Sequence, residues 1–299
     1  MTIILQQLAF LYIFFFLGWL FGKRKPGLTS GTGVLSFLLV NLFLPAKTFN
    51  SFSKNFTVEY ISQNYKSLFF SLGFLLFTVG FALLVAKLVT PREYEQRVFR
   101  YSLTLSNYAY MGYVLVENLF GAQALTSQIL FSIPFAFYTY TFGYAMLTSK
   151  GNLLKKLINP IIAALLLGMV AGLTGLQMPD LISQLLSSCA GCVGPLSMVM
   201  TGLVLSGFSL RELIFDKGTY IIVAVRLLVL PAITFGICQI PLLRPFLRYA
   251  VLMASMPCGL NTIVFPKLVG EDCRPGARLA LLSHLFSIAT LPLWLALIR

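Results

Sequence analysis

The chain has 299 residues, of which 58% are hydrophobic and only 10% charged, and its formal net charge is +13. Soluble domains carry about 25% charged residues, so this composition excludes a soluble globular protein and predicts an all-α polytopic membrane protein. Basic residues that flank apolar spans follow from the positive-inside rule and from anionic lipid. We therefore expect the lipid bilayer as a partner and no nucleic acid.

Ten apolar stretches are long enough to cross the hydrocarbon, which takes about 20 residues. The first precedes Lys23, Arg24 and Lys25 and has no basic residue before it, which predicts an uncleaved span rather than a secretory signal. The connections are expected to be short, the longest near residues 51–66 and 87–100. The predicted spans are residues 3–22, 32–50, 67–88, 101–120, 124–147, 158–177, 181–206, 218–239, 247–268 and 277–298.

The distribution of basic residues predicts the orientation. Of the 22 Lys and Arg residues, fifteen fall on one side of these spans and six on the other, while Arg226 falls inside a span. The richer side is expected to be cytoplasmic. Both termini are then extracellular or periplasmic, and the protein is expected in the plasma (inner) membrane.

An odd number of spans in each half requires the second half to be inverted relative to the first. Residues 1–149 and 150–299 are the two predicted repeats, and weak internal similarity supports them. The matching pairs are Pro45 with Pro195, Ser106–Gly121 with Ser255–Gly270, and Phe131–Ile133 with Phe286–Ile288.

Two of the spans are interrupted. Span 9 contains Pro257, Cys258, Gly259 and Asn261 at its middle, and Ser106–Gly121 of span 4 carries a weaker version of the same pattern. A freed backbone group in hydrocarbon costs several kcal/mol, so such a break persists only where protein or a wet cavity covers it. In secondary transporters that cavity is often the substrate site. We predict that spans 4 and 9 face each other and form a carrier's binding site.

Asparagines and small residues carry this predicted site. Asn107 and Asn261 supply amide donors and acceptors, and Gly112, Pro257 and Gly259 open the backbone. Half-helices that begin near a break direct their positive N-terminal ends into the site, which suits anions. The alternative is that each polar residue satisfies only its own kink.

Few ionisable groups lie within the spans, and each has two interpretations. Lys47, next to Thr48, either extends to the outer interface or attracts a carboxylate substrate. Glu117 is either a solvated carboxylate near the outer end of span 4 or a proton-coupling group.

Two further ionisable groups belong to the second half. His284, the only histidine, is either a packing residue or a proton relay. Arg226 precedes Pro231 and either satisfies carbonyls that the helix break frees or binds an anion.

Other motifs point away from catalysis. The sequence has no P-loop, HExxH, GxSxG or Cys/His cluster, so we expect no enzyme, no cofactor and no metal. Cys189 and Cys192 have redox spacing but lie in an apolar run, where helix packing is the better explanation. Gly168 and Gly172 form a GxxxG face that serves either internal packing or a homodimer.

Several motifs resemble the auxin efflux carrier (PIN-like) family, which includes bacterial permeases. Residues 107–112 resemble its Asn-x-Gly-Phe-x-Gly-x-Pro segment, and residues 44–49 resemble its Leu-Pro-x-Leu-x-Phe. Further similar segments, which extend the resemblance over nearly the whole chain, are Asn159-Pro160, Gly194-Pro195-Leu196, Met256-Pro257, Gly270–Asp272 and Leu291-Pro292.

The resemblance implies ten helices in two inverted five-helix repeats, with spans 4 and 9 broken and crossing. Spans 1, 2, 6 and 7 would form a scaffold that often dimerises, and spans 3–5 and 8–10 a transport unit that moves past it like an elevator. Asn107 matches the family's crossover asparagine and Thr48 a small hydroxyl residue at the site. Ala109 and Val114 replace a family glycine and proline, and Lys47 replaces an aliphatic residue.

The sequence therefore predicts a secondary transporter that moves a small organic anion, a carboxylate or an auxin-like compound. The alternative is a membrane receptor or sensor that keeps a carrier fold and binds ligand without translocating it.

Overall fold

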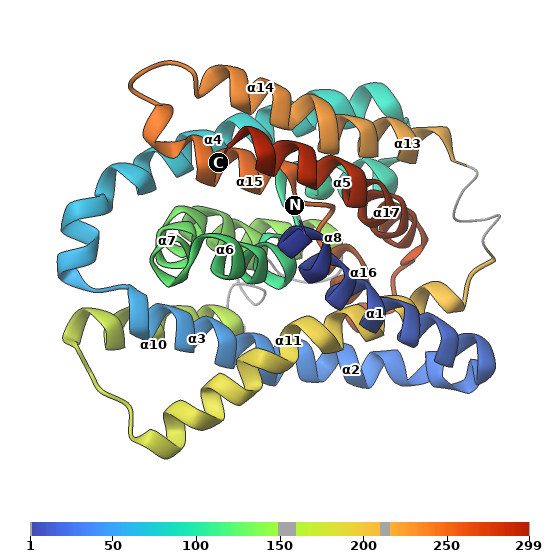
Figure 1. The fold of residues 1–299 in the computed structure, drawn as a ribbon. Helices are drawn as coiled ribbons and strands as arrows, with labels where there is room; N and C mark the ends of the chain where they lie inside the picture. Colours follow the sequence, from blue (N-terminus) through green and yellow to red (C-terminus); the bar gives the residue numbers. More distant parts are fainter. Residues whose placement is uncertain (1, 149–159, 210–215, 299) are drawn as a thin grey trace.

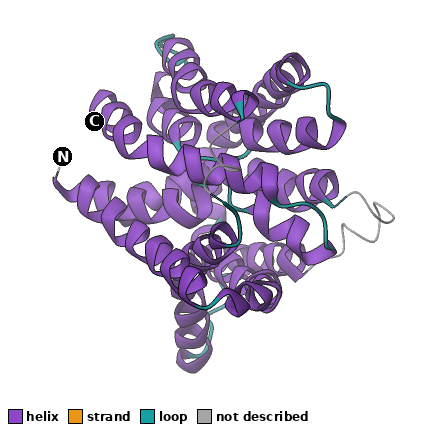
Figure 2. Cartoon of the chain, turned by 90° about the vertical axis from the view of Figure 1, so that its right-hand side faces the viewer, coloured by secondary structure: helices purple, strands orange, loops and turns teal. Residues whose placement is uncertain are grey.

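The computed structural model describes residues 2–148, 160–209 and 216–298, and all regular elements within these ranges are helices (Figures 1 and 2). The first half contains α1 (Thr2–Arg24), α2 (Thr32–Leu38), α3 (Leu44–Asn55), α4 (Val58–Val89), α5 (Glu93–Thr104), α6 (Tyr113–Phe120), α7 (Ala122–Tyr138) and α8 (Tyr144–Leu147). The second half contains α10 (Pro160–Thr174), α11 (Asp180–Ser206), α13 (Lys217–Ala224), α14 (Leu230–Ile237), α15 (Leu247–Ser255), α16 (Asn261–Val269) and α17 (Arg274–Leu297).

Several helices have the length and surface of membrane-spanning segments. Among the described residues, five helical segments are long and apolar enough to cross a membrane: Pro26–Asn55, Val58–Val89, Asp180–Ser206, Lys217–Ile237 and Arg274–Leu297. On α4, Phe69, Leu76 and Leu84 expose between 64% and 72% of their surface, and their spacing places them on one side of the helix. A large apolar face without protein cover belongs in lipid. The chain is therefore an integral, polytopic membrane protein.

The two connections expected to be longest are in fact short, so that prediction was wrong. α3 continues to Asn55 and α4 begins at Val58, while α5 begins at Glu93, four residues after α4 ends. The helices extend into polar sequence because their ends are capped: the Thr57 side chain accepts a hydrogen bond of 3.1 Å from the backbone N–H of Tyr60. Hydropathy marks the apolar part of a helix and misses such polar turns.

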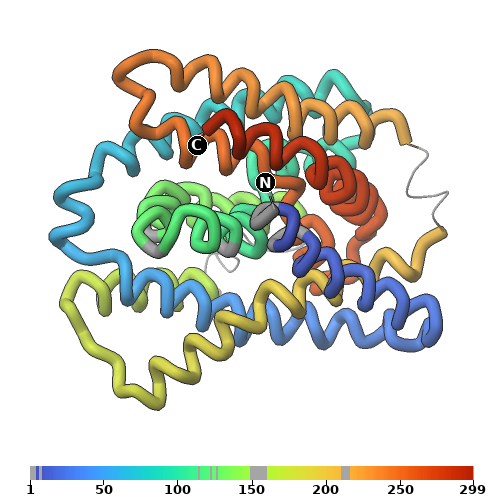
Figure 3. Tube along the Cα trace, in the orientation of Figure 1, coloured from blue at the N-terminus to red at the C-terminus, as the bar shows by residue number. Residues whose placement is uncertain are grey.

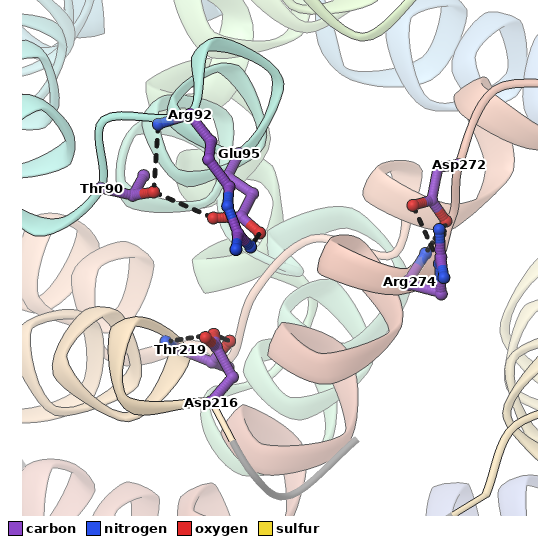
Figure 4. Close-up of polar contacts among 7 residues, drawn as sticks. All are labelled: Thr90, Arg92, Glu95, Asp216, Thr219, Asp272 and Arg274. Carbon is purple, nitrogen blue, oxygen red and sulfur yellow. Dashed lines mark hydrogen bonds and ion pairs between the residues drawn. The ribbon is translucent and has the colours of Figure 1, made fainter. Parts of the chain in front are cut away.

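Polar caps also close the helix ends on the side expected to be cytoplasmic (Figure 4). Thr90 and Arg92 both donate to the Glu95 carboxylate over 2.9 Å. The Asp216 carboxylate caps α13 by accepting from the backbone N–H of Thr219 over 2.9 Å. Asp272 accepts from the Arg274 side chain at the start of α17, also at 2.9 Å.

Two prolines within apolar helices lie next to π-helical turns. Leu39–Phe43 lies just before Pro45, and Val225–Val229 lies just before Pro231. Proline lacks an N–H, so the carbonyl four residues earlier loses its helical partner. For Pro231 that carbonyl belongs to Leu227, and the indole N–H of Trp294 donates to it over 2.8 Å.

Glycines allow two helix pairs to approach closely. A Cβ atom on Gly202 of α11 would lie 2.1 Å from the carbonyl oxygen of Phe15 on α1. A Cβ on Gly172 of α10 would lie 2.6 Å from the carbonyl oxygen of Phe56, and one on Gly168 would lie 3.0 Å from that of Phe49. The GxxxG face of α10 therefore packs against α3 within the chain, and the two helices lie side by side (Figure 3).

Candidate functional site

Two helices are interrupted at the centre of the molecule. α5 ends at Thr104, and a π-helical turn, Tyr108–Gly112, leads from the break into α6. α15 ends at Ser255, and α16 begins at Asn261 after five non-helical residues. Residues 101–108 and 250–266 are all buried. Both interruptions therefore occur where the sequence pattern predicted them, and both are covered by protein.

The two breaks contact each other. The backbone N–H of Asn107 donates to the carbonyl of Pro257 over 2.8 Å, and Ser106 forms an antiparallel bridge with Cys258. Met256, directly before the proline, is extended with ψ of 147°, as expected of a residue in that position. A Cβ atom on Gly259 would lie 3.3 Å from the Ser106 carbonyl oxygen, so a larger residue there would push the two breaks apart.

Arg226 joins both breaks from a third helix. Its side chain is 1% exposed and donates to three main-chain carbonyls: Leu103 over 2.8 Å, Met253 over 2.7 Å and Met256 over 3.2 Å. Leu103 and Met253 lie in the last turns of α5 and α15, where the helical partners of carbonyls are missing, and Met256 directly follows α15. Arg226 therefore caps main-chain carbonyls, as one of its two interpretations expected, but these carbonyls lie at the two broken helices and not at the break before Pro231 of its own helix.

Asn107 and His284 form the polar centre of the site. The Asn107 carboxamide nitrogen lies 3.0 Å from His284 Nε2, and His284 Nδ1 lies 2.7 Å from the carbonyl oxygen of Ala280. Tyr12 of α1 donates to the main-chain carbonyl of His284 and contacts Ser287 at 3.0 Å. The Asn107 side-chain oxygen is buried and has no hydrogen-bond partner among the described residues.

Asn261 lies on the opposite broken helix and pairs with Tyr110. The Tyr110 hydroxyl donates to Asn261 Oδ1 over 3.0 Å, which links the π-helical turn to the start of α16. Sequence reasoning missed Tyr110, although a tyrosine between Asn107 and Gly112 in an interrupted span was a usable signal. The Gly112 N–H donates to the Asn107 main-chain carbonyl over 3.1 Å, and a Cβ there would meet only ordinary contacts.

Lys47 and Glu117 line a cleft beside the breaks. The cleft has a volume of about 510 Å³ and is formed by α1, α3, α6, α7 and α11. Lys47 is half-buried on α3, and its ammonium group donates to the Ala109 carbonyl over 2.9 Å, so it contacts the π-helical turn instead of reaching outward. Glu117 is exposed on the cleft wall, in agreement with its solvated interpretation.

Thr48 follows Lys47 on α3 and is not among the residues that line this cleft. It lines a cavity of about 30 Å³ together with Tyr108, Tyr113 and Tyr140, and that space holds about one water molecule. The structure thus brings Asn107, Pro257, Gly259, Asn261 and His284 into one buried cluster. Lys47 and Glu117 line the neighbouring cleft, and Thr48 lines the small cavity beside Tyr108.

The charge of this region is positive. Within the described ranges, ion pairs are found for Arg92, Arg97 and Arg274, and none involves Arg226 or Lys47. No group of three or more His, Cys, Asp or Glu side chains arranged to hold a metal is found among the described residues.

A polytopic helical membrane protein with a polar cluster at two interrupted helices has the architecture of a membrane transporter. A model of the membrane transport protein family matches residues 3–153 and 148–295. The chain belongs to this family, that of the auxin efflux carriers, and the resemblance seen in the sequence motifs is confirmed. Members of the family are transporters, not enzymes. No curated protein sequence matches the chain.

Proposed function

We propose that the protein is a secondary transporter that moves a small organic anion, a carboxylate or an auxin-like compound, by elevator-type alternating access. The observation that carries this proposal is the contact between two buried helix interruptions, with Asn107 and Asn261 on its two sides. Ten spans in two inverted repeats, residues 1–149 and 150–299, are part of the proposal. The substrate would bind where the breaks meet, between these asparagines and the backbone at Gly112, Pro257 and Gly259.

The geometry of the breaks supports the repeat. α5 and α15 end at Thr104 and Ser255, which are 151 residues apart, and the Tyr110–Asn261 pair has the same separation. The sequence alignment pairs Ser106 with Ser255 at a separation of 149 residues, and Gly121 and Gly270, which end α6 and α16 with positive φ, have that separation. The two ranges matched by the family model also meet at the proposed boundary near residue 150.

Contacts between distant segments support the proposed sidedness. Tyr94 donates to the Asp272 carbonyl over 2.7 Å, and Lys23 donates to the Phe208 carbonyl over 3.4 Å, all in segments assigned to the cytoplasmic side. The start of α1 and the end of α17 lie near each other in two perpendicular views (Figures 1 and 2). An even number of membrane crossings places both termini on the same side of the membrane, and the neighbouring positions of the two ends agree with this.

Positive charge supports an anionic substrate. Arg226 stays ionised under all ordinary conditions, and it lies buried at the breaks without a carboxylate partner in the described structure. Lys47 adds a second cation at the inner end of the cleft. The π-helical turn that leads into α6 begins at Tyr108 and α16 begins at Asn261, both at the breaks, where helix N-termini favour negative charge.

The close helix pairs support a rigid scaffold of spans 1, 2, 6 and 7. α1 packs on α11, and α10 packs on α3, at glycines that let the helices approach closely. The two interrupted helices belong to spans 4 and 9, outside this scaffold. Exposed leucines of α10, such as Leu167, would face lipid or a second copy in the proposed homodimer. His284 is the proposed proton-coupling group, whereas the exposure of Glu117, the other candidate, favours a solvated carboxylate.

The test is flux in proteoliposomes with a panel of labelled carboxylates: succinate, malate, malonate and indole-3-acetate. Asn107→Ala and Asn261→Ala are expected to abolish flux, because each removes an amide from the site while the surrounding helices remain. Asn41→Ala is the matched control, since this exposed asparagine donates only to the Phe37 carbonyl over 2.9 Å. Wild-type flux in both site variants would refute the site. Saturable binding without flux would favour the receptor alternative.

A further inference from the structure

The hydrogen bonds of His284 determine where its proton lies. Nδ1 is 2.7 Å from the carbonyl oxygen of Ala280, and a carbonyl oxygen only accepts, so Nδ1 carries the hydrogen. In the neutral ring the other nitrogen, Nε2, then offers a lone pair. The group 3.0 Å from Nε2 is the carboxamide nitrogen of Asn107, which donates to it.

This bond fixes the orientation of the Asn107 carboxamide. With the NH₂ group held against the ring, Oδ1 points away from His284, and this oxygen is buried without a partner in the described chain. The nearby N–H groups of Met111 and Gly112 do not reach it, because both donate to the main-chain carbonyl of Asn107. Asn107 is itself 1% exposed. A buried acceptor without a donor costs about 1–3 kcal/mol, so it calls for a ligand or a function.

We propose that His284 sets the hydrogen-bonding polarity of Asn107, which presents an acceptor to the site while the ring is neutral and a donor once the ring is protonated. A proton on Nε2 turns that nitrogen into a donor, and two donors cannot face each other. The carboxamide then turns over about its Cβ–Cγ bond, Oδ1 accepts from Nε2–H, and the NH₂ group takes the former position of Oδ1.

Among the described neighbours of His284, Asn107 is the group that is hydrogen-bonded to Nε2, where the added proton would lie. Tyr12 of α1 contacts the main-chain carbonyl of His284, and its hydroxyl is not bonded to the ring. Cys258 bonds through its backbone N–H to Ser283, and Arg226 is turned toward main-chain carbonyls. Among the described residues no carboxylate is paired with the ring. Asn107 is thus the side chain whose hydrogen bond must reverse when Nε2 is protonated.

The inference rests on the proposed function, because it gives Asn107 its role toward the substrate. An anion accepts hydrogen bonds, so it would meet repulsion from Oδ1 in the neutral state and a donor in the protonated state. Proton and anion would therefore bind together. By thermodynamic reciprocity, the factor by which the proton improves anion binding equals the factor by which the anion improves proton binding, on the order of 5- to 150-fold for such couplings.

The test uses the fact that His284 is the only histidine. Protein labelled with ¹⁵N in histidine and asparagine is placed in lipid nanodiscs without substrate, and its ¹⁵N spectrum is recorded as the pH is lowered. We expect protonated Nδ1 and bare Nε2 at neutral pH, with a ¹⁵N–¹⁵N coupling across the hydrogen bond from Asn107 to Nε2. That coupling should disappear on protonation, when an oxygen replaces the nitrogen.

A hydrogen on Nε2 in the neutral ring would overturn the proposal, as would a coupling that survives protonation or a ring that stays neutral until the protein unfolds. Asn107→Leu should remove the coupling, whereas Asn261→Leu, the equivalent change at the asparagine bonded to Tyr110, should keep it. The wild-type spectrum decides the matter even if a variant fails to fold. Absence of flux for every carboxylate would refute the proposed function and leave this measurement intact.

Discussion

Replacing Arg226 tests whether one side chain holds the two broken helices together. Arg226→Met removes the donors to the carbonyls of Leu103, Met253 and Met256, all in a buried region. Each stranded carbonyl costs about 1–3 kcal/mol. The loss is partly offset, because the buried charge is removed as well, and we expect a net decrease of about 3–5 kcal/mol in the free energy of unfolding.

Arg226→Lys keeps the charge, but a point-like ammonium cannot span three carbonyls as the planar guanidinium does, so we expect a smaller loss of about 2 kcal/mol. The assay is SDS-induced unfolding in mixed micelles, followed by the fluorescence of the two tryptophans. Arg248→Met is the control, because this exposed arginine stacks on the Phe120 ring, a contact worth about 1 kcal/mol or less. Arg226→Met within about 1 kcal/mol of wild type would refute the bridging role.

Three further predictions concern packing, a proline and pH. Gly172→Ala should destabilise by about 1–3 kcal/mol through overpacking against α3, whereas Gly80→Ala, with open space around it, should be neutral or stabilising in the same unfolding assay. Trp294→Phe should lower the free energy of unfolding by about 1–3 kcal/mol, because the Leu227 carbonyl loses its donor. The loss should be smaller in a Pro231→Ala background, where the backbone N–H of residue 231 can donate to that carbonyl. Equal losses in the two backgrounds would contradict this explanation. For Asp272, burial raises the pKa but the hydrogen bonds from Arg274 outweigh it and hold the pKa below its usual range. Its stabilising effect is therefore present above about pH 4 and lost as the pH falls further, and Asp272→Asn should flatten that part of the stability–pH profile.

The positions of the helices and of the second break were readable from the sequence. Apolar runs mark helices because hydrocarbon forces the backbone to satisfy its own hydrogen bonds. Pro257 and Gly259 mark a break because neither supports a continuous helix, and the proline also restricts the residue before it. The basic residues and asparagines of the site were identifiable because polar groups are rare in such spans.

The partners of these residues were not readable. Tyr110 and Asn261 are 151 residues apart, and one sequence carries no signal for a pair at that separation. Arg226 was assigned to the break at Pro231, but Trp294 satisfies that carbonyl and Arg226 reaches two other helices. The GxxxG face of Gly168 and Gly172 had two open uses, and only the packing against α3 decides between them. Such choices depend on tertiary contacts rather than on local pattern.

The central claim is that the substrate binds where the two interruptions meet. The most direct test is a solid-state NMR distance between the ¹³C-carboxylate of a transported anion and the ¹⁵N-labelled asparagine side chains, assigned with Asn107→Ala and Asn261→Ala. We expect the carboxylate carbon within about 4 Å of an amide nitrogen of Asn107 or Asn261, as a direct hydrogen bond requires. A transported carboxylate that contacts neither asparagine would contradict the account.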